Sequence, residues 1–193
     1  MHIAFVFLGL ACIAACAHAQ SGLLKVADFE SGDLSQLQTQ KAQDDSITLV
    51  TAPVRAGRFA ARTLLRASDP EVNKGQRAEF SDSKRITRIE MDKDYWYGLS
   101  IYLPGEFAAP KKRDAVLFQW HTQQGGPSPV LAIRVRNGEW FITSDATDKR
   151  RVLAKIPFEQ DRWTDWVAHV RWSAGDTGFW TIWKDGVEVV NER

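Results

Sequence analysis

Apolar and polar residues alternate with a period of two along several short segments of this 193-residue chain. Residues 95–103 show the pattern over the longest stretch, with an apolar set of Tyr95, Tyr97, Leu99, Ile101 and Leu103. Residues 130–136 and 166–172 alternate in the same way, and no helical period is sustained after the first 22 residues. Because residues two apart lie on one face of a strand, the pattern predicts strands that each turn one face toward a core.

Turn signals divide the chain between these segments. Asn137-Gly138 and Asp185-Gly186 each separate two apolar runs and predict two-residue hairpins. Further strands are expected over residues 23–29, 46–51, 59–66, 115–121, 139–144, 179–183 and 187–190. Short strands at this spacing are typical of an all-β, antiparallel sandwich. We therefore expect one β-sandwich domain over residues 20–193.

The first 19 residues have the composition of a leader. An apolar run over residues 3–15 is followed by Ala17-His18-Ala19, a small-residue cleavage pattern, and the run is too short to cross a bilayer. We predict a signal peptide over residues 1–19, no membrane span, and a periplasmic or secreted mature chain. Residues 13–16 also approximate a lipoprotein box, which leaves a lipid anchor at Cys16 as the alternative.

Composition narrows the classes of function. Both cysteines, Cys12 and Cys16, lie in the leader, so the chain after Ala19 has neither a disulfide nor a reactive thiol. A formal net charge of +1 argues against nucleic acid as a partner. The sequence contains no metal-ligand cluster, phosphate-binding loop or Ser-His-Asp arrangement that we recognise. We expect no metal, no other cofactor and a monomer.

Polar side chains share a face on two of the predicted strands. Gln119 and His121 are two apart, and Arg77 and Glu79 are two apart on another strand. The apolar face of the first strand would hold Val116, Phe118 and Trp120. An amide, an imidazole, a guanidinium and a carboxylate on one sheet face suit the binding of an acidic ligand and the removal of a proton from it. The alternative for Arg77 and Glu79 is a solvated, mutually paired face.

Other side chains could extend such a site. Four basic or histidine positions alternate outward on two strands and favour an anionic glycan: Arg134, Arg136, His169 and Arg171. His169 and Arg171 could instead belong to an ordinary surface. Tyr102 lies on the mixed face of its strand. Most of the eight Trp are expected in the core, with one or two available as a platform on which a sugar ring stacks.

The order of six motifs resembles the heparin-lyase-I-like and glucuronan-lyase-like polysaccharide lyases, and more loosely the jelly-roll alginate lyases. The motifs are DFESGDL (28–34), GQRAEF (75–80), YWYGLSIYLP (95–104), QWH (119–121), WTDWV (163–167) and WKDG (183–186). The resemblance covers nearly all of the mature chain and implies a jelly-roll, concanavalin-like sandwich. It also implies that Arg77 and Gln119 neutralise a uronate carboxylate, and that His121 assists them or accepts the C5 proton.

The sequence departs from that family at its end. The resemblance implies a tyrosine acid or base in a Y-x-K-x-G-x-Y-like strand, and no such motif follows Gly186. We expect a chain that lacks its last strands and is weakly active or inactive by itself. The proton donor is then either in the missing segment or replaced by Tyr102.

Two functions follow as expectations. The first is β-elimination in an anionic, uronic-acid-containing polysaccharide, because removing the weakly acidic C5 proton needs an offset carboxylate charge and a base such as histidine. Arginine suits the carboxylate better than lysine, since its planar fork binds both oxygens. The second is a non-catalytic, lectin-like sandwich, because one fold hosts many functions.

Overall fold

The structure is a computed structural model that describes residues 22–82, 89–122, 126, 128–147 and 149–193. The chain divides into two compact units. One holds Met1–Thr51 and Arg58–Thr87, and the other holds Ala52–Gly57 and Arg88–Arg193. Regular structure in the described part is almost entirely strand, with one short 3₁₀ helix, η2 (Asp44–Ser46). No helix there is both long enough and apolar enough to cross a membrane.

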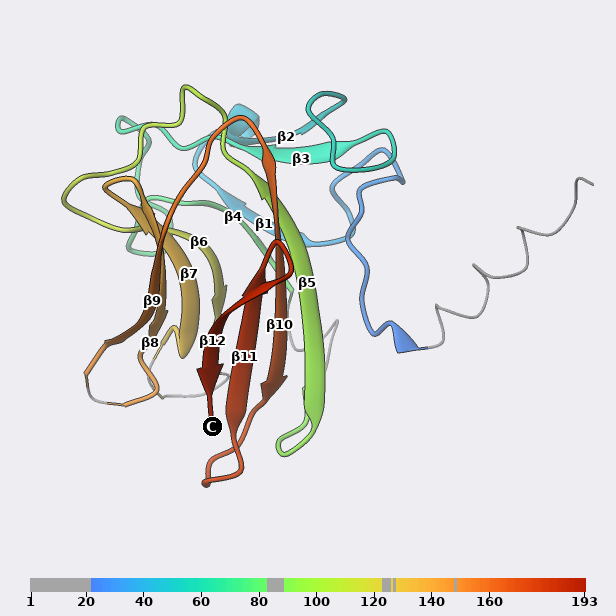
Figure 1. Cartoon of the computed structure of the whole chain (residues 1–193). Coiled ribbons are helices and arrows are strands. Elements are labelled where there is room, and N and C mark those ends of the chain that lie inside the picture. Colours follow the sequence, from blue (N-terminus) through green and yellow to red (C-terminus); the bar gives the residue numbers. More distant parts are fainter. Residues whose placement is uncertain (1–21, 83–88, 123–125, 127, 148) are drawn as a thin grey trace, which may run out of the picture. The chain divides into compact units, whose positions relative to one another are not determined.

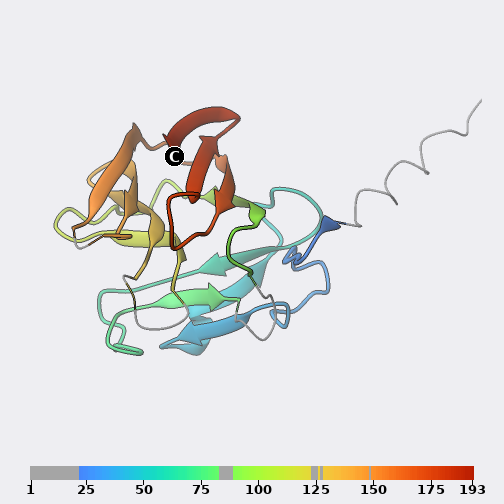
Figure 2. The ribbon, with the colours of Figure 1, turned by 90° about the horizontal axis from the view of Figure 1, so that it is seen from below.

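The first unit contains two short antiparallel ladders (Figure 2). β1 (Gln38–Lys41) pairs with β4 (Ala78–Ser81), and β2 (Ile47–Val50) pairs with β3 (Ala60–Thr63). The strand expected over residues 23–29 is absent from the described structure, so that prediction was wrong. β1 was missed because its residues, QTQK, carry no apolar alternation; its pairing with β4 comes from a distant part of the chain.

The second unit is a sandwich of two four-stranded antiparallel sheets (Figure 1). One, here called the β5 sheet, has the order β12-β11-β10-β5, and the other, the β6 sheet, has the order β6-β7-β8-β9. The β5 sheet consists of β5 (Asp94–Tyr102), β10 (Trp163–Arg171), β11 (Phe179–Lys184) and β12 (Val187–Glu192). The β6 sheet consists of β6 (Ala115–Trp120), β7 (Leu131–Arg136), β8 (Glu139–Ser144) and β9 (Arg151–Pro157). Sequence analysis did not predict β9.

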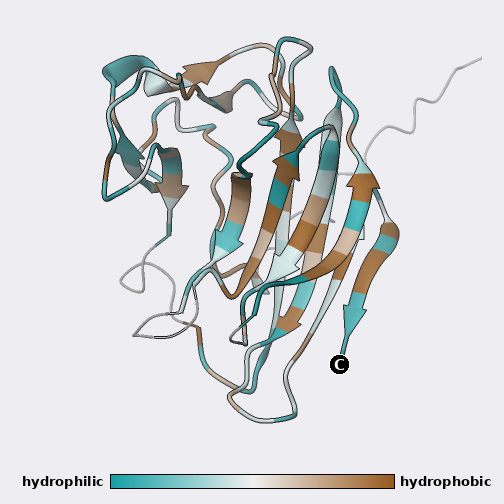
Figure 3. Cartoon of the chain, turned by 90° about the vertical axis from the view of Figure 1, so that its left-hand side faces the viewer, coloured by the Kyte–Doolittle hydropathy of each residue, from teal (hydrophilic) through white to brown (hydrophobic). Residues whose placement is uncertain are grey.

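Side chains from both sheets form one hydrophobic core, as the alternation along the sequence predicts. The fully buried members include Leu131, Ile133, Val135, Trp140, Ile142, Trp166 and Val170. Hydrophobic and hydrophilic bands alternate along the long strands in Figure 3, which is the same period of two seen in space. Both predicted hairpins are confirmed: Asn137-Gly138 and Asp185-Gly186 have φ values of 52° and 83°, and 50° and 80°.

A β-bulge changes one predicted face of β6. The register between β6 and β7 shifts between Val116 and Phe118, so Leu117 is the extra residue. Leu117, Phe118 and Trp120 pack against the core, whereas Val116 is 38% exposed and lies opposite Arg134. Val116 was therefore assigned to the wrong face. The alternation resumes at Phe118, which leaves Trp120 inside and Gln119 on the outer face of the β6 sheet.

Candidate active site

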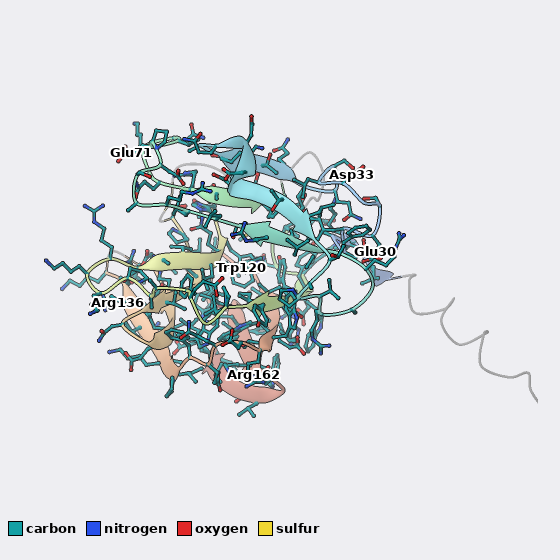
Figure 4. The ribbon with its side chains drawn as sticks, turned by 90° about the horizontal axis from the view of Figure 1, so that it is seen from above. Glu30, Asp33, Glu71, Trp120, Arg136 and Arg162 are labelled. Carbon is teal, nitrogen blue, oxygen red and sulfur yellow. The ribbon has the colours of Figure 1, made fainter. Side chains whose placement is uncertain are left out.

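Gln119 lies on the outer face of the β6 sheet, the face that points away from the core. It pairs in register with Ala132 of β7, which in turn pairs with Thr143 of β8. Trp120, one residue on and labelled in Figure 4, points into the core. There its ring meets those of Phe118 and Tyr97. The amide of Gln119 and the indole of Trp120 therefore lie on opposite faces of the β6 sheet, as the two-residue period predicts.

His121 follows directly after the end of β6 and is exposed. The two-residue alternation therefore does not orient its ring. Its Nδ1 atom instead makes a short contact with the hydroxyl of Ser128. Nearby, the Val130 N–H donates to the Trp120 carbonyl at 2.8 Å, which joins the end of β6 to the start of β7. A neutral imidazole that donates through Nδ1 carries its accepting lone pair on Nε2.

A cluster of charges surrounds Arg134 on the same outer face. Arg134 is only 5% exposed, and its Nε donates to the Thr143 hydroxyl at 2.9 Å. Its terminal nitrogens lie 3.8 Å from Asp114 and 3.9 Å from Asp145. Burial lowers the pKa of Arg134 from its ordinary value, because desolvation disfavours the charged guanidinium.

Two more arginines complete this cluster. Arg136 lies 3.2 Å from Asp114, and Arg150 binds Asp145 through two nitrogens at 2.8 and 3.0 Å. The hydrogen bond from Arg150 holds the pKa of Asp145 below its usual range. Three arginines thus face two carboxylates, an excess of one positive charge. Arg136 is 44% exposed and projects away from the interior (Figure 4), so part of this charge can meet an anion.

Arg134 was expected to face solvent, and that expectation was wrong. Sequence analysis also missed the partners of Arg134, because Asp114 and Asp145 lie outside β7, the strand that holds Arg134. A usable signal was present: Arg134 stands between Ile133 and Val135 in a strongly apolar strand, where a charge needs a partner.

Arg77 and Glu79 belong to the first unit. Glu79 lies in β4, and Arg77 immediately precedes that strand. Arg77 donates to Glu79 at 3.0 Å and to the Asn73 carbonyl at 3.2 Å. Arg77 and Glu79 therefore pair with each other, which is the alternative that the sequence left open for them. The Arg77 Nε atom is buried and has no hydrogen-bond partner among the described residues.

The structure does not bring Tyr102, His169 and Arg171 to the face of Gln119. They lie on the outer face of the β5 sheet, on the other side of the core, because their strand neighbours Ile101, Ala168 and Val170 face inward. His169 and Arg171 both bind Asp94, at 3.0 and 2.6 Å. Tyr102 approaches Asp161 at 3.4 Å, and burial, followed by the charge of Asp161, raises its pKa. These three residues are therefore separate from the Gln119 face.

A shallow pocket also opens on the outer face of the β5 sheet. Its lining includes Arg55, Arg162, Trp163, Asp165 and Asp185. Arg55 binds Asp165 at 2.7 Å and Arg162 binds Asp185 at 3.0 Å, so its charges are matched within the pocket. Among the described residues, no group of three or more His, Cys, Asp or Glu is placed to hold a metal ion.

Comparison with known proteins identifies the family. A sequence model of a family described as "Polysaccharide lyase" matches residues 29–193. The chain belongs to this family. No match was found among curated proteins. Among solved structures, this lyase is similar to the endo-β-1,4-glucuronan lyase of the fungus Trichoderma reesei, with a TM-score of 0.64 and 17% sequence identity over 80% of this chain and 70% of that one.

The structural likeness shows a shared fold. Together with the antiparallel sheets described above, it confirms the predicted jelly-roll class. Membership of the family makes the chain a polysaccharide lyase, which confirms the class of enzyme expected from the sequence.

Proposed function

We propose that this lyase cleaves a uronic-acid-containing polysaccharide by β-elimination, with glucuronan as the first polymer to test. The observation that carries the proposal is the placement of Gln119 on the face that holds the Arg134 cluster, next to the end of β6 where His121 follows. A net positive face with neutral donors supports an anionic sugar ring. The glucuronan lyase of similar fold supports the choice of polymer.

The chemistry assigns a role to each group. Gln119 donates a hydrogen bond to the uronate carboxylate, which stabilises the charge that develops when the C5 proton leaves. For Arg77, in the first unit, the resemblance to the glucuronan-lyase-like enzymes implies the same role. His121 removes that proton through Nε2, in the tautomer whose Nδ1–H donates to the Ser128 hydroxyl. Electrons from the C5–H bond then form the C4–C5 double bond as the bond from C4 to the glycosidic oxygen breaks. That oxygen leaves with the bonding electron pair and takes up a proton from water to become a hydroxyl group. Glu79 orients Arg77 through their 3.0 Å hydrogen bond.

The test is a lyase assay on glucuronan, alginate and heparin that follows the absorbance of the unsaturated product. His121→Ala should lower turnover by about 100-fold or more, since a positioned base contributes that much. His121→Asn should not restore it, because an amide can donate to a carboxylate but does not take up a proton at neutral pH. Arg77→Ala should also lose about 100-fold, with Arg62→Ala, an exposed arginine of β3, as its matched control.

The outcomes separate the roles. Full turnover in His121→Ala would remove His121 from the mechanism. Substantial turnover in His121→Asn would make it a carboxylate ligand rather than the base. Equal losses in Arg77→Ala and Arg62→Ala would show a general effect of charge.

We further propose that the lyase is exported. Support comes from the apolar run and the Ala17-His18-Ala19 pattern, which lie outside the described residues. Mass spectrometry of the mature protein distinguishes a chain that begins at Gln20 from one acylated at Cys16. An uncleaved chain that begins at Met1 would contradict export by either route.

A further inference from the structure

An exposed stack of aromatic rings lies on the outer face of the β5 sheet. Trp96 is 62% exposed. Its ring stacks on that of His169, with centroids 4.1 Å apart and planes 7° apart, and lies beside that of Trp183 at 5.7 Å and 15°. The three rings are nearly parallel and stacked, so the exposed Trp96 ring offers a flat aromatic surface that the other two rings support. We call this group of three rings the Trp96 platform.

Strand pairing places the three rings of the platform on the outer face of the β5 sheet, away from the core. Trp96 pairs with His169, and Trp183 pairs with Val167, so all three rings come from neighbouring strands on one face. A hydrogen bond of 3.0 Å to Asp94 fixes the His169 ring. Gly98 is the next residue of β5 on this face, and a Cβ added there meets nothing within 4 Å. The surface beside Trp96 is thus open.

An exposed aromatic ring suits a sugar ring. An aromatic face carries partial negative charge and attracts the slightly positive C–H groups that line one face of a pyranose ring. Charged groups stand at the edge of the platform, where they can reach hydroxyl or carboxylate groups. Arg171 and Arg193 both lie over the Phe179 ring, at 5.5 and 5.9 Å, and Phe179 packs against His169 at 4.8 Å.

We propose that the Trp96 platform binds a pyranose unit of a polysaccharide chain at a second site, on the opposite side of the core from Gln119. The occupant follows from the family, whose members act on polysaccharides, and does not depend on a uronic acid being the substrate. Such a site holds the enzyme on a long polymer while the Gln119 face engages another segment. Each contact raises the effective concentration of the other.

The test measures binding rather than turnover. Affinity electrophoresis in gels that contain glucuronan, alginate or heparin gives a Kd for the His121→Ala chain and for the same chain with Trp96→Ala. Truncating a stacking Trp at the centre of a binding surface should weaken Kd by about 10-fold for at least one polymer. Trp96→Phe should keep most of the affinity. Leu24→Ala, 65% exposed in the first unit, is the control and should change nothing.

Each result decides the matter. Equal retardation of the chains with and without Trp96→Ala in all three gels overturns the proposal. Size-exclusion chromatography that shows a dimer broken by Trp96→Ala, with polymer affinity intact, also overturns it and makes the face an interface between two copies. Binding that depends on Trp96 in a protein that degrades none of the polymers would keep the platform and reject the proposed uronate lyase. Turnover without such binding would do the reverse.

Discussion

Replacing Arg134 by Met tests what stabilises the outer face of the β6 sheet. Met keeps much of the buried aliphatic volume but removes the Nε donor, which lies 2.9 Å from the Thr143 hydroxyl. Thr143 is 1% exposed, so its hydroxyl would lose a partner out of reach of bulk water. Leaving a buried polar group unsatisfied costs about 1–3 kcal/mol.

Two further effects change this figure in opposite directions. Removing the guanidinium recovers its desolvation cost, which is the leading reason that its pKa is lowered. Removing it also deprives Asp114 and Asp145 of a cation, but those contacts are long, at 3.8 and 3.9 Å, and both carboxylates keep Arg150. We therefore expect the free energy of unfolding to fall by about 1–2 kcal/mol.

Urea unfolding followed by tryptophan fluorescence measures the change, with the m-value as a check that the transition is unaltered. Adding Thr143→Val to Arg134→Met should recover most of the loss, because both partners are then apolar. A loss of about 4 kcal/mol that Thr143→Val does not recover would refute this reasoning. It would mean that the ion pairs dominate, as expected when one partner of a close buried pair is removed.

Two more predictions concern packing and pH. The bulge in β6 predicts that Leu117→Ala lowers the free energy of unfolding by about 2 kcal/mol, whereas Val116→Ala changes it by less than about 0.5 kcal/mol. Urea unfolding measures both changes, and a larger loss for Val116→Ala than for Leu117→Ala would contradict the register. The hydrogen bond from Arg55 is the main reason that the pKa of Asp165 falls from 3.8 to about 2, so its stabilisation is present above pH 3.8 and is lost as the pH falls toward 2. Arg55→Ala should therefore raise the pKa of Asp165 and move acid unfolding to higher pH. The loss of stability at neutral pH should be at most about 1 kcal/mol, since the Asp165 side chain is 40% exposed and its charge is screened. Acid unfolding followed by circular dichroism would contradict this if its midpoint did not move.

The sequence by itself determined the strands with one apolar face. Residues 95–103, 130–136 and 166–172 have their predicted sides toward the core, because burial of apolar side chains acts on every second residue and is readable in any single strand. The two hairpins were equally local, since Asn-Gly and Asp-Gly adopt the positive φ values that the turns require. The position of Gln119 opposite Trp120 followed from the same rule.

Only the tertiary structure decided which polar residues share a face. Arg134, His169, Arg171 and Tyr102 all alternate outward, but the outer faces of the two sheets point in opposite directions across the core, and period alone does not say to which sheet a strand belongs. The partners of Arg134 come from segments outside its strand, and the bulge at Leu117 depends on β7. The Trp96 platform likewise exists because three strands of the β5 sheet meet in register. Alternation is a property of one strand, whereas a site depends on which strands are neighbours.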